Sequence, residues 1–136
     1  MHIVLAVKPD SDEPWIIDAV VGLARQTGAS VAVVAADTVE LERLEATPRS
    51  VFTQAAERTA TAAARRLTDA GIEATATVRP GRPLPGILDF ATEQGADLIV
   101  AGASHRPVVA ERLLGSVPLD LIKQSSRPVV VITKPS

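Results

Sequence analysis

Short apolar stretches alternate along the chain with longer segments that have helical spacing or polar turns. The stretches cover residues 2–8, 30–36, 72–79, 98–101 and 127–133. All but the third are almost continuously apolar, which is typical of strands buried on both faces of a parallel sheet. Residues 72–79 instead alternate between apolar and polar side chains, so this strand is expected at a sheet edge or with one face in water.

Apolar residues at helical spacing fill the intervals between these strands. The predicted helices cover residues 15–26, 50–70, 83–95 and 116–125. A glycine such as Gly28 stops each of the first three, because glycine readily takes the left-handed conformation that ends a helix. Asp12 is expected to cap the first helix and Ser116 the last. Pro118 is tolerated in the last helix because first-turn N–H groups have no partner within a helix.

The alternation of strand and helix predicts an α/β fold with a three-layer, open, parallel, five-stranded sheet. The chain is expected to form a single domain over residues 1–136. Strand order 3-2-1-4-5 puts the alternating strand at one edge and strands 2–8 and 98–101 at the centre.

This order leaves the last strand at the other edge of the sheet. Its run Val129, Val130, Val131 and Ile132 is too apolar for an edge in water. Because an exposed apolar edge pairs readily with another strand, we expect a homodimer joined through these residues. Burial of the same run under the chain's own loops is the alternative.

Composition and charge argue against several classes of partner. The formal net charge is −2 and the sequence holds no basic run, so no nucleic-acid partner is expected. No apolar run approaches the ~20 residues of a membrane span, and the chain opens on its first strand without a signal-like segment. We therefore expect a cytoplasmic protein with no membrane partner. The absence of cysteine excludes disulfides and thiolate chemistry.

The segment after the fourth strand carries the strongest indication of a binding site. The strand 98–101 stops at Gly102, a polar loop follows, and Gly115 and Ser116 precede the next helix. In an open parallel sheet, a helix that starts beside the carboxyl end of a strand presents free N–H groups and the positive end of its dipole. This arrangement favours a phosphate or another anion.

Three runs spread over the whole chain resemble the universal stress protein family. They are IVLAV at the start, VRPGRPLPGILDFATEQGADLIVAG in the middle and LLGSVPLDLIKQSSRPVVVI at the end. The resemblance implies the adenine nucleotide alpha-hydrolase-like form of the flavodoxin-like fold, with a site for ATP or another adenine nucleotide. It also implies that Gly102, Gly115 and Ser116 hold phosphates and that Ala36 and Val117 face the adenine or ribose.

Two positions depart from the pattern of that family. His105 replaces the middle glycine of the phosphate loop, and Lys8 replaces the acidic residue that closes the first strand. In an unchanged loop, a histidine in place of glycine costs roughly 1 to 3 kcal/mol of backbone strain. Lys8 cannot accept hydrogen bonds from ribose hydroxyls, although it can donate to a phosphate. With Arg106 and Arg112, these residues would suit another anion or a differently placed nucleotide. Alternatively, His105 is an exposed loop residue and the site is lost.

No arrangement of residues typical of catalysis or of metal binding is present, so we expect a binding protein and not an enzyme. Asp10, Asp12 and Glu13 are interpreted as turn and capping residues. The first hypothesis is a universal stress protein-like module that binds an adenine nucleotide or another anion, with a protein partner that the sequence does not identify. The alternative is a dimeric interaction module without a cofactor, in which the ATP site has degenerated. A weak nucleotide hydrolase is the third hypothesis.

Overall fold

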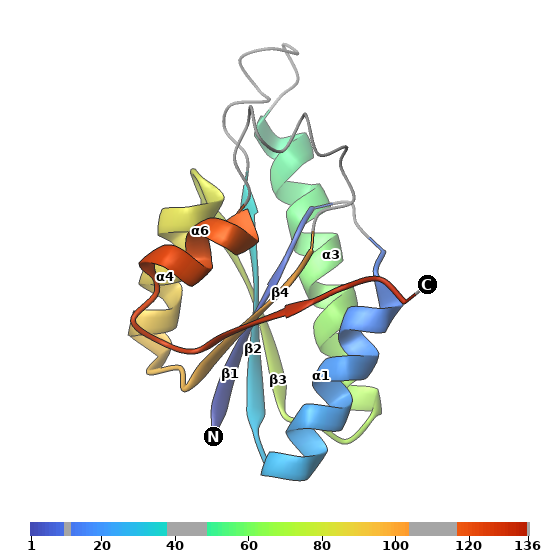
Figure 1. The fold of residues 1–136 in the computed structure, drawn as a ribbon. Helices are drawn as coiled ribbons and strands as arrows, with labels where there is room; N and C mark the ends of the chain where they lie inside the picture. The colour runs from blue at the N-terminus through green and yellow to red at the C-terminus, as the bar shows by residue number, and fades with distance from the viewer. Residues whose placement is uncertain (10–11, 38–48, 104–116, 136) are drawn as a thin grey trace.

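The computed structural model describes residues 1–9, 12–37, 49–103 and 117–135 (Figure 1). The strands are β1 (His2–Val7), β2 (Ser30–Asp37), β3 (Ala74–Pro80), β4 (Leu98–Gly102) and β5 (Val129–Ile132). The helices are α1 (Pro14–Thr27), α3 (Arg49–Asp69), α4 (Pro83–Gln94) and α6 (Val117–Gln124). The predicted strands and helices are therefore confirmed, with small shifts at their ends.

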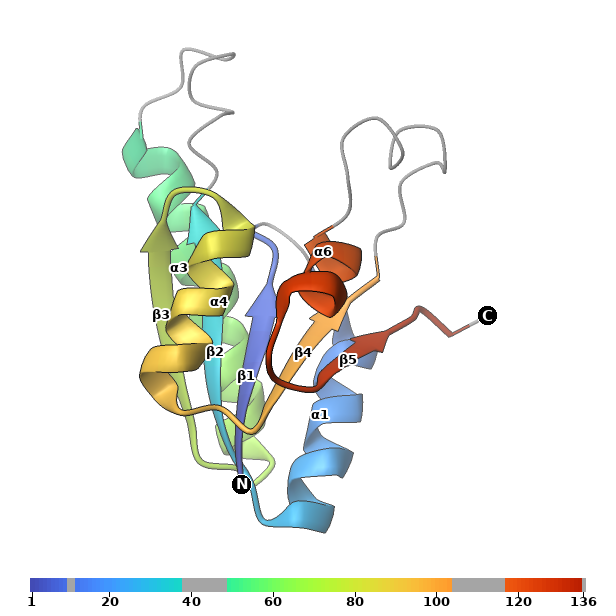
Figure 2. The same ribbon diagram turned by 60° about the vertical axis from the view of Figure 1, so that its left-hand side comes forward.

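All the strands are parallel and follow the order β3-β2-β1-β4-β5, which confirms the predicted topology (Figure 2). Val7 pairs with Ala35 on one side of β1, and Ala6 pairs with Ala101 on the other side. The strand order reverses between β1 and β4, because the chain first builds outward to β3 and then returns to the other side of β1. In open α/β sheets, ligands bind beside the carboxyl ends of the strands at such a reversal.

Two apolar clusters fill the space between the sheet and its helices. Helices α1 and α3 cover one face, and α4 and α6 cover the other (Figure 1). Successive strand residues point to opposite faces, so neighbouring residues enter different clusters. Leu5 belongs to the cluster under α1 and α3, whereas Val4 belongs to the cluster under α4 and α6. Both are fully buried, as expected for a central strand.

The observed ends of the helices agree only partly with those predicted from the sequence. Gly28 (φ 70°) and Gly95 (φ 62°) close α1 and α4 in the left-handed conformation, as predicted. The prediction that Asp12 caps α1 is wrong: the N-cap residue is Glu13, and its side chain makes no capping hydrogen bond. The helix begins at Pro14, because the fixed φ of proline suits the first helical position and proline has no N–H that would need a cap.

The two sheet edges differ in character. On β3, Thr75 and Ala76 are exposed, whereas the guanidinium of Arg79 lies 5.4 Å from the ring centroid of Phe90 and pairs with Glu93. The predicted edge position of β3 is confirmed, although the exposed residues are consecutive and do not follow the alternating pattern. At the other edge, each residue of β5 is half-buried. The position of β5 is confirmed, while its pairing with a second copy stays a prediction.

Candidate functional site

The described parts of the predicted site come together at the carboxyl end of the sheet. Lys8 directly follows β1, and Ala36 stands at the equivalent level on the neighbouring strand β2, because Val7 pairs with Ala35. Gly102 closes β4 on the other side of β1. Lys8 is exposed, whereas Ala36 and Gly102 are buried. These residues, far apart in sequence, therefore line up across three adjacent strands.

Helix α6 brings Val117 to the same end of the sheet. Val117 is the first residue of α6 and is half-buried. It packs on the cluster that contains Ala101, and Ala6 of β1 packs on that cluster as well. The amino end of α6 therefore lies beside the carboxyl ends of the two central strands. His105, Gly115 and Ser116 of the predicted site lie outside the described residues, as do Arg106 and Arg112.

Gly102 is required by the packing of α1 against β4. A Cβ atom at this position would overlap Cδ1 of Ile16, a residue in the first turn of α1 that is only 4% exposed. The missing side chain thus allows the helix to approach the end of the strand closely. Sequence reasoning connected this glycine with phosphate, but the contact with Ile16 accounts for it without a ligand.

A carboxylate stands beside Gly102. The Oε2 atom of Glu13 is buried and lies 3.4 Å from the position that a Cβ on Gly102 would take. Glu13 thus occupies the N-cap position, as its interpretation as a turn or capping residue implies, but its side chain makes no capping hydrogen bond and turns toward β4. The sequence contains only a weak signal for this position, namely an acidic residue directly before the proline that begins a helix. That Gly102 lies beside this residue is visible only in the folded chain.

The Glu13 carboxylate reaches a small cavity of about 100 Å³ between α1, α3 and the end of β1. The cavity is lined by Val7, Asp12, Glu13, Ile16, Ile17, Thr59, Ala62, Ala63 and Arg66. Asp12 and Arg66 form an ion pair 3.9 Å long, and the Asp12 side chain is 91% exposed. Such an exposed pair contributes little to stability, because water screens it. The cavity therefore combines apolar walls with charged groups of both signs.

Trp15 provides a natural probe of this region. It is the only tryptophan of the chain, occupies the first turn of α1 and is half-buried. The Nζ atom of Lys134 lies 5.4 Å from its ring centroid, so the segment after β5 contacts the beginning of α1. Changes near the carboxyl ends of β4 and β5 are therefore expected to alter the fluorescence of Trp15.

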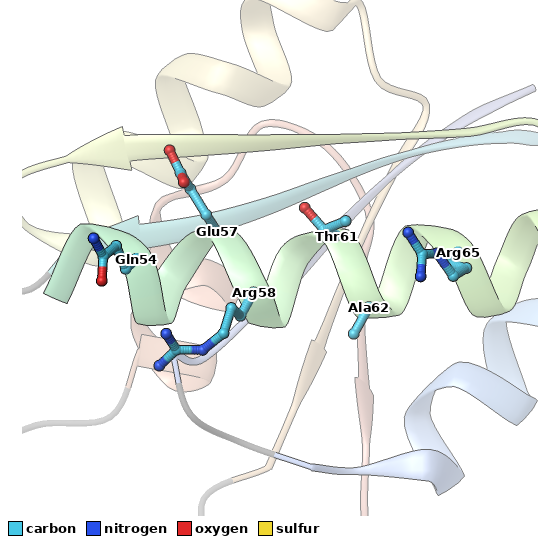
Figure 3. Close-up of a pocket in the computed structure, with 6 residues that line it drawn as sticks. All are labelled: Gln54, Glu57, Arg58, Thr61, Ala62 and Arg65. Atoms are coloured by element: carbon cyan, nitrogen blue, oxygen red, sulfur yellow. The ribbon is translucent and has the colours of Figure 1, made fainter. Parts of the chain in front are cut away.

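Other hollows lie elsewhere on the molecule. One, of about 430 Å³, runs along the outer face of α3 and is lined by the exposed residues Gln54, Glu57, Arg58, Thr61, Ala62 and Arg65 (Figure 3). Another, of about 410 Å³, lies at the amino end of the sheet and includes Arg25 and Glu73. Neither contains a residue of the predicted site. Within the described ranges, no cluster of three metal-ligating side chains is found. No helix there is long and apolar enough to span a membrane.

Comparison with known proteins finds relatives that all belong to one family. The model of the universal stress protein family matches residues 1–133. A universal stress protein of Methanocaldococcus jannaschii is 33% identical over 70 residues, which cover 52% of this chain and 43% of that protein. The match therefore spans less than half the length of this curated relative.

Solved structures match over almost the whole chain. The structure of a universal stress protein from Archaeoglobus fulgidus has a TM-score of 0.76 and 27% sequence identity, covering 97% of this chain and 98% of that one. A structure of the universal stress protein from the same organism in complex with dAMP has a TM-score of 0.74 and 25% identity, covering 97% of each chain. Since the family model extends over nearly every residue of the sequence, this chain belongs to the universal stress protein family.

Proposed function

We propose that the chain is a binding module for an adenine nucleotide, which it holds at the carboxyl ends of β1 and β4. The observation that carries the proposal is that Gly102 and the beginning of α6 both lie beside the end of β1, where the strand order reverses. Backbone N–H groups and the helix dipole at such a place favour phosphate. The dAMP complex of the Archaeoglobus relative supports an adenine nucleotide as the ligand.

Each residue of the proposed site has a distinct contribution. Lys8, exposed at the end of β1, supplies a cation for a phosphate oxygen. Ala36 and Val117 offer small apolar surfaces to the adenine or ribose. Gly102 lets the first turn of α1 pack directly against the end of β4, next to the proposed ligand. His105, Gly115 and Ser116 complete the proposed phosphate side. The proposal gives each of these residues a role in holding the ligand and none a role in a reaction, so the protein acts by binding its ligand and not by turning it over.

The direct test is isothermal titration of the purified chain with AMP, ADP, ATP and cyclic AMP. The proposal predicts saturable binding of at least one of them, accompanied by a change in Trp15 fluorescence with the same midpoint. Phosphate release should not exceed that of a Lys8→Ala and Ser116→Ala double variant. Absence of heat and of a fluorescence change for all four ligands at millimolar concentration would remove the proposal.

One observation favours the second hypothesis, a nucleotide-free interaction module. The contact between Gly102 and Ile16 explains the glycine that closes β4 without any phosphate. If the site has degenerated through Lys8 and His105, the double substitution Lys8→Asp and His105→Gly should create nucleotide affinity that the natural chain lacks. Weaker affinity in the double variant would instead show that the natural residues serve a ligand.

Dimerisation through β5 is compatible with both the nucleotide-binding hypothesis and the interaction-module hypothesis. Leu119 and Ile122 on α6 are 56% and 54% exposed, although they are large and apolar. At 100° per residue they lie on the opposite side of the helix from Val117, which packs on the cluster under α4. The two residues therefore form an apolar surface on the side of α6 that faces away from this cluster. If a second copy pairs antiparallel along β5, the two α6 helices meet across the dimer axis and cover Leu119 and Ile122.

A further inference from the structure

The outer side of β3 is open among the described residues. β3 is the last strand on its side of the sheet, and no described strand pairs with it on the side away from β2 (Figure 2). The carbonyl oxygen of Glu73 accepts a hydrogen bond from the N–H of Val31 in β2. Because backbone groups alternate in direction along a strand, the N–H and C=O groups of Ala74, Ala76 and Val78 face outward. Another strand can pair with this row of groups.

This edge is uncharged in its middle and flanked by charges of opposite sign. Residues 74–78 are Ala, Thr, Ala, Thr and Val, whereas Glu73 precedes them and Arg79 follows. Charged residues within an edge strand usually prevent pairing with another chain. Here the charges stand at the two ends, and Pro80, which has no N–H, closes the strand. The edge therefore favours a strand that carries the matching charges at its own ends.

The β3 strand of a second copy meets this requirement. In an antiparallel pair centred on Ala76, every outward-facing residue of one copy lies opposite an outward-facing residue of the other. The same register places Glu73 of each copy opposite Arg79 of the other. Both side chains lie on the face of the sheet that α4 covers, because Arg79 stacks on Phe90 and pairs with Glu93 of that helix. Opposite charges across two strands stabilise their pairing.

The side of α3 next to this edge shows a similar complementarity. α1 lies over β4 and β5 and α3 over β2 and β3, and Ala63 and Arg66 line the cavity toward α1. At 100° per residue, Glu57, Thr61 and Arg65 lie on the flank of α3 that faces away from α1. All three are exposed and line the hollow on α3 (Figure 3). In two antiparallel α3 helices centred on Thr61, Glu57 of each copy meets Arg65 of the other.

One twofold axis satisfies the strand and the helix together. The N–H of Ile72 donates to the carbonyl oxygen of Leu67, which joins the end of α3 to the start of β3. Thr61 lies about 9 Å along the helix from Leu67, and Ala76 about 13 Å along the strand from Ile72, so the two centres have similar heights. Because α3 covers both β2 and β3, the two helices would lie about 10 Å apart, a usual distance for packed helices.

We infer that β3 and the adjacent flank of α3 form a self-association surface, on which a second copy of this chain pairs antiparallel about a twofold axis near Ala76 and Thr61. The side chains at this contact are small or polar, so it is weak, with a dissociation constant of about 0.1 to 1 mM, and is dissociated at micromolar concentration. It lies at the opposite edge of the sheet from β5 and does not depend on the nucleotide site. Where both edges pair, the copies join into an open chain.

Cysteine substitution tests the register, because the natural sequence contains no cysteine. In the proposed pair the Cα atoms of the two Ala76 residues lie about 5.5 Å apart, within the range that a disulfide bridges. Thr75 is equally exposed, but it lies diagonal to its own counterpart at about 7 to 8 Å, outside that range. At about 0.5 mM protein, mild oxidation should therefore crosslink Ala76→Cys at least about tenfold faster than Thr75→Cys.

Charge reversal in the Ala76→Cys chain tests the complementarity. Glu57→Lys and Glu73→Lys each place like charges at two symmetric positions of the contact, so each should slow the crosslinking by about fivefold or more. Asp18→Lys is the matched control, because it changes the net charge equally on the exposed face of α1. Its effect should stay within about twofold. The comparison of the two cysteine variants decides even if a charge variant does not fold.

Three results would overturn the inference. Equal crosslinking rates for Ala76→Cys and Thr75→Cys would indicate random collision of exposed residues. Equal slowing by Asp18→Lys would indicate an effect of net charge and not of the contact. An association step near millimolar concentration that leaves Ala76→Cys uncrosslinked would mean that β3 meets another part of the neighbouring copy. Fast crosslinking at Ala76 alone, slowed by Glu57→Lys and Glu73→Lys, supports the inference.

Discussion

Ile16 occupies, with its Cδ1 atom, the space that a side chain on Gly102 would need. This contact joins the first turn of α1 to the end of the central strand β4. Any ligand at the carboxyl end of the sheet therefore meets a surface whose shape depends on a helix and strand in direct contact. The contact between Ile16 and Gly102 therefore predicts an effect on the stability of the fold that does not depend on any ligand.

Replacing Gly102 by alanine should destabilise the fold. The added methyl group overlaps Ile16, and overpacking of this kind costs about 1 to 3 kcal/mol of unfolding free energy. Urea denaturation measures the change. Shortening the opposing side chain in the double variant Gly102→Ala and Ile16→Val should recover part of the loss. A Gly102→Ala chain as stable as the natural one would show that the close approach does not constrain this glycine.

Gly22 supplies a matched control within α1. A Cβ atom there meets no neighbour within 4 Å, and its position is inside a helix. Gly22→Ala should therefore raise the unfolding free energy by about 0.5 to 1 kcal/mol, because alanine loses less backbone entropy in a helix. The same substitution is thus expected to have opposite signs at the two glycines.

Two leucines of α6 should respond differently to truncation. Leu121 is fully buried in the cluster under α4 and α6, whereas Leu119 is 56% exposed. Leu121→Ala should lower the unfolding free energy by about 2 to 5 kcal/mol, because it removes packed methyl groups and leaves a cavity. Leu119→Ala should change the stability of the monomer by less than about 0.5 kcal/mol. Denaturation at low protein concentration compares the two, and similar losses would contradict the packing of α6.

A proline in β5 tests the proposed dimer. The carbonyl oxygens of Pro128 and Ile132 accept hydrogen bonds from the β4 side, so alternation directs the N–H of Val131 to the free edge. Val131→Pro removes that donor and preserves the pairing with β4, since proline is tolerated on the open side of an edge strand. Val130→Pro, by contrast, removes a donor that faces β4.

Sedimentation equilibrium and thermal unfolding separate these two effects. Val131→Pro should convert a dimer into a folded monomer, whereas Val130→Pro should lower the melting temperature. A natural chain that is monomeric at every accessible concentration would contradict the proposed dimer, as would a Val131→Pro variant that remains dimeric.

Reversing the charge of Lys8 should weaken nucleotide binding. Lys8 stands at the end of β1 and is the cation that the proposal assigns to a phosphate oxygen. Lys8→Glu should raise the dissociation constant of AMP by about tenfold, through loss of attraction and added repulsion. Lys123→Glu, on the exposed face near the end of α6, changes the net charge equally and should have less than about a twofold effect. Equal effects of the two substitutions would indicate only a long-range influence of charge.

The sequence predicted the fold well because burial in a parallel sheet leaves a strong pattern. β1 and β4 read as continuously apolar runs, and the alternating residues that precede Pro80 marked the edge strand. These patterns reflect how many faces of each strand are covered. They therefore indicate which strands lie at the centre of the sheet and which lie at its edges.

Contacts between distant residues could not be predicted in the same way. No local pattern connects Glu13 with Gly102, because 89 residues separate them and only the docking of α1 on β4 brings them together. The expected cap at Asp12 was wrong for a related reason, since Pro14 fixed the start of the helix one residue later than the acidic pattern implied. Lys8, Ala36 and Gly102 could be assigned to one end of the sheet because each closes a predicted strand.

The most direct test of the proposed site is a map of backbone amide chemical shifts during titration with AMP. The account predicts that the amides of Lys8, Gly102 and Val117 shift together and saturate with one dissociation constant, while those of Arg25 and Glu73 at the amino end remain unchanged. Saturable shifts confined to Arg25 and Glu73, or no shifts at millimolar AMP, would contradict a nucleotide site at the carboxyl ends of β1 and β4.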